Sequence, residues 1–346
     1  MPHARRGIAA AGNWIIDHIF IVDRWPQEET LANILDEDRG TGGAPYNVLV
    51  DLARFGPGEN GNPIPLEAVG LIGDDADGAF IRQDGAAHGI DLSALGTSDE
   101  APTSYTNVMV VQNTGRRTFF HNRGANARFG PEHVPVDALG ARIAHLGYLL
   151  LLDRMDEPDD EYGTAAARVL ARLQEAGIRT SIDVVSEDSD RFPKIVKPAL
   201  AHADYAILNE LEAGRTTGHD LKPGDRPDPE AIQASAADLL ALGVRELVCI
   251  HMPEGAYVRT ADGQEVWQPA LRLPNGYVKG AAGAGDAFCA GLLYGLHEDW
   301  PLQDGLRLGV CAAAMSLSRP GCTEACTTVS DTLVLAGTYP YQKAVL

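Results

Sequence analysis

The sequence is poor in aromatic residues, in cysteine and in positive charge. Phe, Tyr and Trp make up 6% of the 346 residues, and 28 Lys and Arg face 48 Asp and Glu, for a formal net charge of −20. A surface this acidic repels nucleic-acid backbones and anionic lipid headgroups. We therefore expect neither a nucleic-acid partner nor a membrane partner, although a small anionic ligand could still bind in a local pocket.

The chain also has no long apolar run. The longest, at 145–152, falls far short of the roughly 20 residues that cross a bilayer, and Gly12 and Asn13 interrupt the pattern that a secretory signal would need. The five cysteines are an odd number, and Cys322 and Cys326 lack a second Cys or His pair that would complete a zinc site. We interpret them as free thiols and predict a cytoplasmic protein.

Short apolar runs alternate with helical patterns through the middle and C-terminal parts of the chain. Runs at 143–152, 179–185, 205–208 and 246–250 indicate buried strands, and patterns at 164–176 and 230–242 indicate helices. Such alternation is typical of an α/β protein with a parallel sheet covered on both faces. Ligands of these sheets bind beyond the carboxyl ends of the strands.

Two stretches depart from this alternation. The segment at approximately 15–40 has no clear helix, and approximately 102–123 reads as a hairpin with Asn113-Thr114-Gly115 at its turn. We expect both segments to form a small β lid inserted into one domain that spans 1–346. The sequence has no internal repeat and no long linker that would favour two equal domains.

The most informative segment is 280–296, where a run of Gly and Ala meets Asp286 before an amphipathic helix. The first N–H groups of a helix are unpaired, and the helix dipole favours an anion beside them. Because Gly283, Ala284 and Gly285 carry no bulky side chains, their N–H groups can approach a phosphate. Asp286 would then act as a general base beside this anion hole. Alternatively, Asp286 only caps the helix and the glycines permit close packing.

Asp17 and the Asn209–Glu212 pair also suit a polar ligand site. Asp17 closes the apolar run 8–16, at the expected exit of a first strand, where its carboxylate can accept hydrogen bonds from two hydroxyls. The three-residue spacing of Asn209 and Glu212 puts both side chains on one helical face, where they could hold a hydrated Mg²⁺. The alternatives are an ordinary turn residue and a helix-capping pair.

Six short motifs follow one another along almost the whole chain. They are Gly12-Asn13 with Asp17, Gly42-Gly43 with Asn47, the segment 69–78, Asn209 with Glu212, the segment 283–291, and the segment 311–321. Together they resemble the motifs of the ribokinase-like, PfkB-type carbohydrate kinases. The resemblance implies a three-layer α/β/α sandwich with a mostly parallel central sheet and a small β lid. It also implies ATP-dependent phosphorylation of a sugar hydroxyl, with fructose, ribose or a related sugar as substrate.

The resemblance further implies a role for each matching residue. Asp286 would be the base and the 283–285 loop the anion hole. Asn209 and Glu212 would organise Mg²⁺ and the ATP phosphates, and Gly255, Gly283 and Gly285 would contact the nucleotide. The sugar-binding residues would be Asp17, Gly42, Gly43 and Asn47, with Asn126 and Asp153 as further candidates.

Two positions depart from the family pattern. Gly280 and Ala281 replace an Asp-Thr pair beside the monovalent-cation site of such kinases, which argues against activation by K⁺. The nucleotide loop 250–255 retains only its last glycine, Gly255, and has lost a hydroxyl that binds phosphate in relatives. His251 in this loop either replaces that hydroxyl or is incidental.

Other functions remain open at this point. A nucleoside kinase would share every motif, and a non-catalytic sugar-binding member would suit the altered 250–255 loop. A dinucleotide-dependent dehydrogenase is disfavoured because the Gly-x-Gly-x-x-Gly fingerprint is absent from the sequence. The apolar patch 108–111 suits either a homodimer formed through the lid or packing of the lid on its own core.

Overall fold

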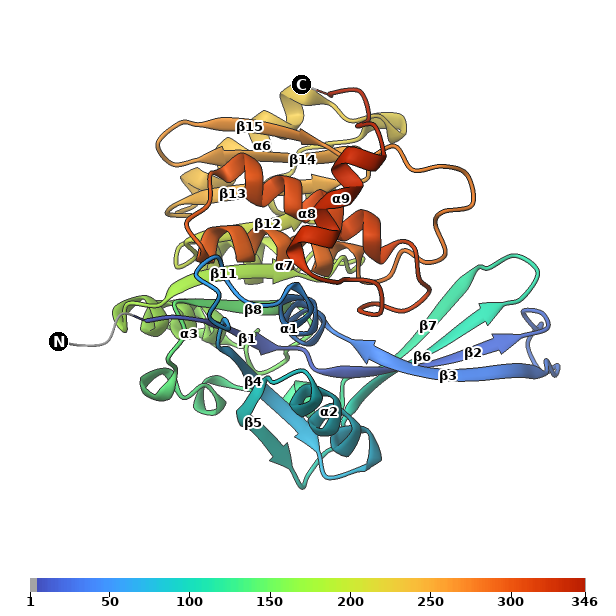
Figure 1. Cartoon of the computed structure of the whole chain (residues 1–346). Helices are drawn as coiled ribbons and strands as arrows, with labels where there is room; N and C mark the ends of the chain where they lie inside the picture. Colours follow the sequence, from blue (N-terminus) through green and yellow to red (C-terminus); the bar gives the residue numbers. More distant parts are fainter. Residues whose placement is uncertain (1–4, 346) are drawn as a thin grey trace.

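A nine-stranded sheet forms the centre of the computed structural model, which describes residues 5–345 (Figure 1). In spatial order its strands are β15 (Glu265–Pro269), β14 (Gly255–Thr260), β13 (Leu247–Met252), β12 (Tyr205–Asn209), β11 (Arg179–Val184), β8 (Ile143–Leu149), β1 (Ile8–Gly12), β4 (Leu66–Gly73) and β5 (Asp91–Ser98). The strands from β13 to β5 run parallel, and β14 and β15 extend one edge as antiparallel strands. The predicted α/β fold with a mostly parallel sheet is confirmed.

Helices cover both faces of this sheet. One layer contains α1 (Ala44–Phe55), α2 (Ala76–Ala87), α7 (Ala284–His297), α8 (Leu302–Ser316) and α9 (Val329–Thr338), and the other contains α3 (Ala165–Glu175), α4 (Phe192–Leu200), α5 (Glu210–Thr217) and α6 (Pro229–Ala241). Strand β1 shows why two layers form. Its alternate residues Ile8 and Ala10 pack into the core beneath α1 and α7, and Ala9 and Ala11 pack into the core beneath α3 to α6.

Shorter elements complete the chain between residues 5 and 345. The two-residue strands β9 (Pro158–Asp159) and β10 (Gly163–Thr164) pair with each other, and single 3₁₀ turns lie at Gly124–Arg128, Pro131–His133, Val136–Ala138 and Pro223–Asp225. Within the described part of the chain, no helix is both long enough and apolar enough to cross a membrane. All five cysteines, each within this part, are free, as predicted.

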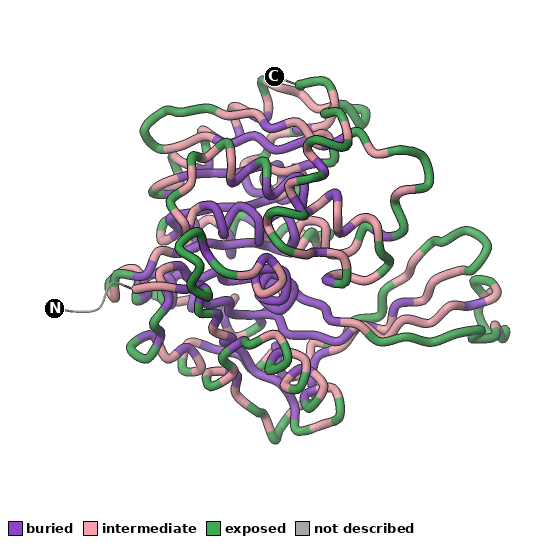
Figure 2. The backbone as a smooth tube through the Cα atoms, viewed as in Figure 1, coloured by how far each residue is buried: buried purple, intermediate pink, exposed green. Residues whose placement is uncertain are grey.

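A separate four-stranded sheet projects from the core at the right of Figure 1. Its strand order is β3 (Ile34–Gly42), β2 (Ile15–Val22), β6 (Ser104–Val111) and β7 (Arg117–Asn122). The predicted hairpin is confirmed, because β6 and β7 pair as antiparallel neighbours. Figure 2 shows that most of this sheet is exposed or half-buried, whereas the inner strands of the central sheet, between its edge strands β5 and β15, are mostly buried. We call this projecting sheet the lid.

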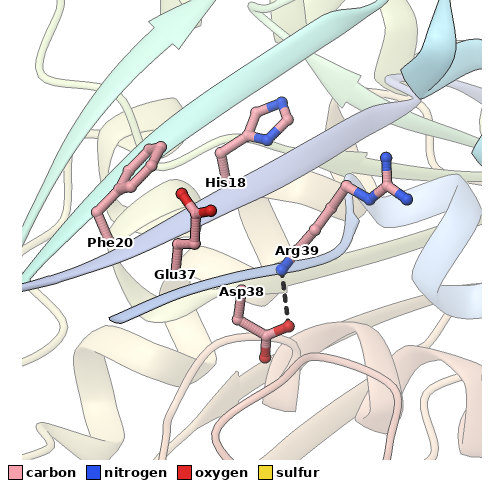
Figure 3. A pocket seen from close by; sticks show the side chains of 5 residues that line it. All are labelled: His18, Phe20, Glu37, Asp38 and Arg39. Carbon is pink, nitrogen blue, oxygen red and sulfur yellow. Dashed lines mark hydrogen bonds between the residues drawn. The ribbon is translucent and has the colours of Figure 1, made fainter. Parts of the chain in front are cut away.

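Polar contacts tie the outer surface of the lid to helix α2. His18 Nε2 lies 2.8 Å from Asp77 Oδ2, and Arg39 Nη1 lies 3.5 Å from Asp77 Oδ1. The Arg39 guanidinium also stacks over the Phe80 ring at 4.1 Å. Beside these contacts the lid carries an open cavity of about 400 Å³ lined by His18, Phe20, Glu37, Asp38 and Arg39 (Figure 3). The position of the lid is therefore set by α2 as well as by the lid's own connections.

The structure corrects the predicted position of Asp17. Strand β1 ends at Gly12, and Asp17 lies on β2 in the lid instead of at the exit of the first strand. Gly12 has φ of 123°, and a Cβ at this residue would lie 1.9 Å from the Gly147 oxygen of β8. The backbone therefore leaves the central sheet at Gly12, and the apolar residues after it belong to the lid.

Two other predicted boundaries also move. Strand β8 ends at Leu149 instead of Leu152, because Leu150 has φ of 78° and cannot continue the strand. Helix α7 begins at Ala284 instead of after Asp286, and almost all of its residues are buried. It is not amphipathic because it packs against the sheet and also contacts α1 and α8.

Candidate active site

Asp286 lies in the first turn of helix α7, at the carboxyl end of the parallel strands. Gly283 precedes the helix with φ of 78°, and a Cβ there would lie 2.5 Å from the Cys322 oxygen. The backbone N–H of Ala287 donates to the Gly283 oxygen at 2.8 Å and closes the first turn. The N–H groups of Ala284, Gly285 and Asp286 come before this bond and are available to an anion.

Two side chains from distant segments hold the Asp286 carboxylate. Asn47 Nδ2 donates to Oδ2 at 2.7 Å, and the Tyr148 hydroxyl donates to Oδ1 at 2.9 Å. Thr41 donates its hydroxyl to Asn47 Oδ1 at 3.1 Å, which turns the amide nitrogen of Asn47 toward Asp286. Burial raises the pKa of Asp286, while the two hydrogen bonds lower it. Asp286 is therefore a fixed carboxylate with an increased affinity for a proton.

The lid places Asp17 near Asp286. Burial raises the pKa of Asp17 to about 6, and the negative charge of Asp286 also raises it. A hydrogen bond with Thr106 and the positive charge of Arg117, both on lid strands, act in the opposite direction. Gly42 lies next to the Asp17 carboxylate, since a Cβ at Gly42 would lie 3.0 Å from Asp17 Oδ2. Asp17 and Asp286 are thus two carboxylates, one from the lid and one from the core, whose charges influence each other.

The start of helix α1 requires glycine at residue 43, where the backbone packs against Asn13. Gly43 has φ of 89°, and a Cβ there would lie 1.9 Å from the Asn13 oxygen and 3.4 Å from Asn13 Nδ2. Asn13 is buried, and its Nδ2 is a donor without a hydrogen-bond partner among the described residues. An unpaired buried donor costs free energy unless a ligand or water satisfies it. Asn13 is therefore a candidate ligand-binding residue to which the sequence analysis assigned no role.

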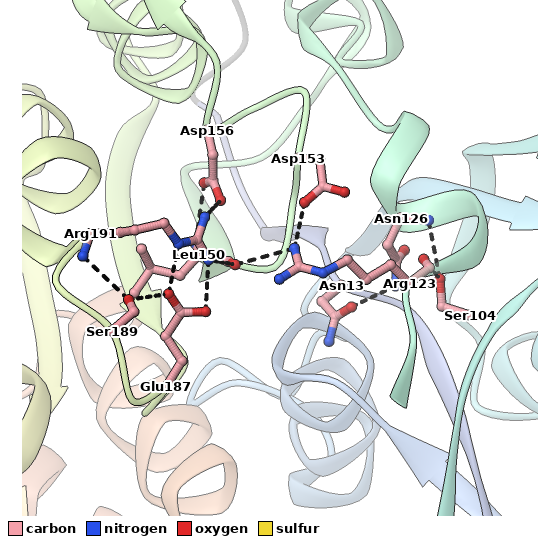
Figure 4. Close-up of polar contacts among 10 residues, drawn as sticks. All are labelled: Asn13, Ser104, Arg123, Asn126, Leu150, Asp153, Asp156, Glu187, Ser189 and Arg191. Atoms are coloured by element: carbon pink, nitrogen blue, oxygen red, sulfur yellow. Dashed lines mark hydrogen bonds and ion pairs between the residues drawn. The ribbon is translucent and has the colours of Figure 1, made fainter. Parts of the chain in front are cut away.

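Asn126 and Asp153 are engaged with other protein groups (Figure 4). Asn126 Nδ2 donates to Asn13 Oδ1 at 2.5 Å and to the Trp14 oxygen at 3.0 Å, and its Oδ1 accepts from Trp14 N at 3.2 Å. Asp153 is about half exposed and pairs with Arg123 at 2.5 Å. Asn126 therefore orients Asn13 through the protein interior, and Asp153 belongs to an ion pair at the root of the lid.

Asn209 and Glu212 form a reciprocal capping box at the start of α5, as one of the two alternatives anticipated. Asn209 Oδ1 accepts from Glu212 N at 2.9 Å, and Glu212 Oε2 accepts from Asn209 N at 2.9 Å. Ser186 donates its hydroxyl to Glu212 Oε1 at 2.7 Å. Burial raises the pKa of Glu212 to about 7, and burial together with the charge of Glu212 raises that of Asp183. This capping role does not exclude ligand binding. Asp183, Glu212 and Asp286 line one cavity, and together their carboxyl groups favour a cation there.

Two cavities meet beside the start of α7. The smaller, about 230 Å³, is lined by Tyr148, Asp183, Val184, Val185, Ser186, Asn209, Glu212, His251, Gly285 and Asp286. The larger, about 770 Å³, has a mostly apolar lining that includes Gly255, Ala284, Phe288, Ala313 and Leu317. Gly285 and His251 border both cavities. The larger cavity suits a planar base and the smaller one suits a phosphate chain with a cation.

The structure thus brings most of the predicted site residues to one edge of the sheet. Sequence reasoning missed Tyr148 and Asp183. Tyr148 lies inside an apolar run that reads as a buried strand, and Asp183 lies at the end of a predicted strand. Their position at the carboxyl ends of β8 and β11 is the signal that could have identified them, because ligands bind at that edge.

Comparison with solved structures identifies the class of fold. The structure of Arabidopsis thaliana ribokinase complexed with ribose and ATP superposes with a TM-score of 0.76 at 20% sequence identity, covering 96% of this chain and 99% of that one. The molecule therefore has the ribokinase fold, and the three-layer arrangement implied by the motifs is confirmed.

Sequence comparison identifies the family. Residues 5–329 match the pfkB family of carbohydrate kinases, and the chain belongs to this family. An ATP-dependent ribose-1-phosphate kinase of Halopiger xanaduensis is 26% identical over 320 residues, which cover 92% of this chain and 95% of the relative. A fructokinase of Klebsiella pneumoniae is 29% identical over 284 residues, which cover 79% and 83%. The protein is accordingly a phosphotransferase that uses an alcohol group as acceptor.

Proposed function

We propose that this protein transfers the γ-phosphoryl group of ATP to a hydroxyl of a neutral sugar, with Asp286 as the general base. The observation that carries this proposal is the position of Asp286 between the two ligand sites. Its carboxylate borders the smaller cavity. On its other side it accepts a hydrogen bond from Asn47, which lies in the first turn of α1 just after Gly43. A base in this position can reach a sugar hydroxyl on one side and a phosphoryl group on the other.

The chemistry follows from these positions. A sugar hydroxyl gives its proton to an Asp286 oxygen, and the sugar oxygen forms a bond to the γ-phosphorus. The bond between the γ-phosphorus and the bridging oxygen breaks, and its electron pair leaves with ADP. The N–H groups of Ala284, Gly285 and Asp286 stabilise the negative charge on the transferred group.

The sugar is held between the lid and the core. Asp17 accepts hydrogen bonds from its hydroxyls, Asn47 faces it from α1, and the backbone at Gly42 and Gly43 allows close approach. Asn13 supplies its unpaired Nδ2 donor. We assign Asn126 to the support of Asn13, and Asp153 to the rim of the site through its pair with Arg123.

Asn209 and Glu212 would hold Mg²⁺ through water, with Asp183 beside them. Both residues line the same cavity as Asp183, and their side-chain oxygen atoms are the ligands that a hard cation such as Mg²⁺ prefers. Among residues 5–345, no group of three or more His, Cys, Asp or Glu side chains could hold a metal ion alone, so phosphate oxygens and water would complete the coordination. Bound Mg²⁺ supplies neutralisation of the phosphate charge.

We further propose little dependence on K⁺. Gly280 brings its loop close to backbone oxygens, since a Cβ there would lie 2.8 Å from the Pro320 oxygen and 3.0 Å from the Arg319 oxygen. Such oxygens could bind a monovalent cation weakly, but the residues at 280 and 281 add no side-chain ligand.

An assay of ATP consumption tests the reaction and identifies the substrate. The panel contains neutral sugars, sugar acids, sugar phosphates and nucleosides, each with Mg²⁺ and with or without K⁺. Turnover of a neutral sugar is the expected result. Preference for a sugar phosphate, the substrate class named for the Halopiger relative, would overturn the neutral-sugar assignment. Preference for a nucleoside would do the same.

Replacing Asp286 by asparagine tests the base. A side-chain amide at this position cannot accept the hydroxyl proton, so Asp286→Asn should lower kcat by at least about 100-fold, the contribution of a positioned base. Sugar binding measured by calorimetry should persist. Unchanged turnover would rule out Asp286 as the base.

We also propose that the protein forms a homodimer through the lid in the cytoplasm. The lid exposes several large apolar side chains, Trp25, Leu31, Ile34, Leu35, Phe119 and Phe120, and the rings of Trp25 and Phe120 stack at 6.1 Å. Exposed apolar patches of this kind favour association. Light scattering should give twice the chain mass of 36.9 kDa. Five free cysteines suit a reducing compartment, and an extracytoplasmic location in cell fractionation would contradict that assignment.

A further inference from the structure

His251 lies where the two cavities meet. It is on strand β13, and its backbone is in register with Asn209 on β12. It borders both the cavity of about 770 Å³ and that of about 230 Å³, as does Gly285 at the start of α7. A nucleotide with its base in the larger cavity and its phosphates in the smaller one would pass beside His251. The structure thus corrects the prediction of a loop: His251 is a strand residue near the carboxyl end of β13.

The imidazole ring is held against the first two turns of α7. Its centroid lies 5.2 Å from the centroid of Phe288, with 32° between the ring planes. A Cβ at Gly285 would lie 3.3 Å from His251 Cε1 and 3.9 Å from Nε2. Glycine at 285 therefore lets the ring lie next to the backbone N–H groups that are available to an anion.

The surroundings keep the ring uncharged. Burial lowers the pKa of His251 to about 4, and no hydrogen bond or nearby charge contributes to this shift. The charged groups on the same cavity walls are Glu210 and Arg272 in the larger cavity and Asp183, Glu212 and Asp286 in the smaller one. A neutral imidazole has one N–H donor and one acceptor nitrogen.

We propose that His251 is a further phosphate-binding residue, whose imidazole N–H donates a hydrogen bond to the phosphate chain of the nucleotide beside the N-terminus of α7. This inference rests on the proposed use of ATP. The ring supplies a directed donor without a positive charge, next to backbone donors that are also neutral. Its tilted contact with the Phe288 ring and its closeness to Gly285 restrain the ring before the nucleotide binds.

Calorimetry with two ligands tests the contact. One ligand is an ATP analogue with a β,γ-imido bridge, and the other is adenosine, which has no phosphate. His251→Leu removes the donor and keeps an apolar side chain, so it should weaken binding of the analogue on the order of 10- to 100-fold, the worth of a hydrogen bond to a charged group. Its affinity for adenosine should be unchanged. His251→Gln, which restores a neutral donor, should bind the analogue within about threefold of the native protein.

A matched control and a folding check accompany these variants. His202 also contacts an aromatic ring, that of Tyr162 at 5.4 Å between centroids in an edge-to-face arrangement, and it lines neither cavity. His202→Leu should bind both ligands as the native protein does. Thermal unfolding verifies that each variant is folded, and His251→Ala, which also removes the donor and should show the same selective loss of analogue binding, carries the test if His251→Leu does not fold.

The outcomes separate this inference from the proposed function. Equal loss of analogue and adenosine binding in His251→Leu, or no loss of either, would overturn the phosphate contact. The native protein could bind the analogue through His251 and still phosphorylate no compound of the panel. That result would contradict only the sugar kinase assignment and would leave the phosphate contact standing. A native protein that binds neither ligand would overturn both.

Discussion

Replacing Asp17 by asparagine separates the cost of its buried charge to folding from the benefit of that charge to sugar binding. Burial raises the pKa of Asp17 from 3.8 to about 6. At 1.36 kcal/mol per pKa unit, this difference corresponds to about 3 kcal/mol. Asp17 is only half-buried, so solvent screening reduces the figure to about 1–2 kcal/mol. Asp17→Asn removes the charge and keeps an oxygen that can accept the Thr106 hydrogen bond.

The sign of the effect follows from proton binding. The pKa of Asp17 is higher in the folded state, so its contribution to stability is full below about pH 4 and is lost as the pH rises to about 6. The native protein therefore bears the cost of the charge at pH 8, and Asp17→Asn does not. For 346 residues the unfolding entropy is about 0.7 kcal/mol per degree, so the variant should have a Tm about 1.5–3 °C higher at pH 8.

The assay is thermal unfolding of the ligand-free protein from pH 4.5 to pH 8, combined with sugar kinetics at pH 8. The gain in Tm should shrink as the pH falls below 6, while the KM for sugar at pH 8 rises about tenfold or more through loss of charge-assisted hydrogen bonds. The control is Asp36→Asn, at an exposed carboxylate on lid strand β3, which should change neither quantity. An Asp17→Asn protein that is less stable at pH 8, or a Tm difference independent of pH, would refute this reasoning.

Two further predictions concern the site and the lid. Tyr148→Phe removes the 2.9 Å hydrogen bond that lowers the pKa of Asp286. The pKa of Asp286 should therefore rise, so kcat should fall about tenfold and the acid limb of the kcat–pH profile should move to higher pH. An acid limb that does not move would contradict this role of Tyr148. The double variant Trp25→Ser/Phe120→Ser should halve the mass measured by light scattering, because it removes the stacked apolar pair from the proposed dimer contact. Its Tm should not fall, because both side chains are exposed. A native protein that is already monomeric would contradict the lid dimer.

The fold could be predicted because its signals are local. Apolar strands that alternate with helices follow from hydrophobic periodicity. The Gly and Ala run predicts available N–H groups at 283–285, and because α7 begins at Ala284 the structure leaves those of 284–286 without a helical partner. The hairpin at 104–122 was equally readable from its Asn-Thr-Gly turn. Where prediction failed, a positive φ ended a strand early: at Leu150 inside an apolar run that gave no sign of a boundary, and at Gly12, where the prediction missed a glycine within the run as the strand's end.

The sequence by itself determined the family, the layered α/β fold and the motif that ends in Asp286, since each depends on residue types at short spacing. Only the tertiary structure decided what surrounds that carboxylate. Asn47 and Tyr148, which bond it, are 239 and 138 residues away in the chain, and His251 reaches Gly285 only because the end of β13 lies beside the start of α7. Hydrogen bonds and charge interactions act over a few ångströms, and the packing of the sheet against α1 and α7 creates that proximity.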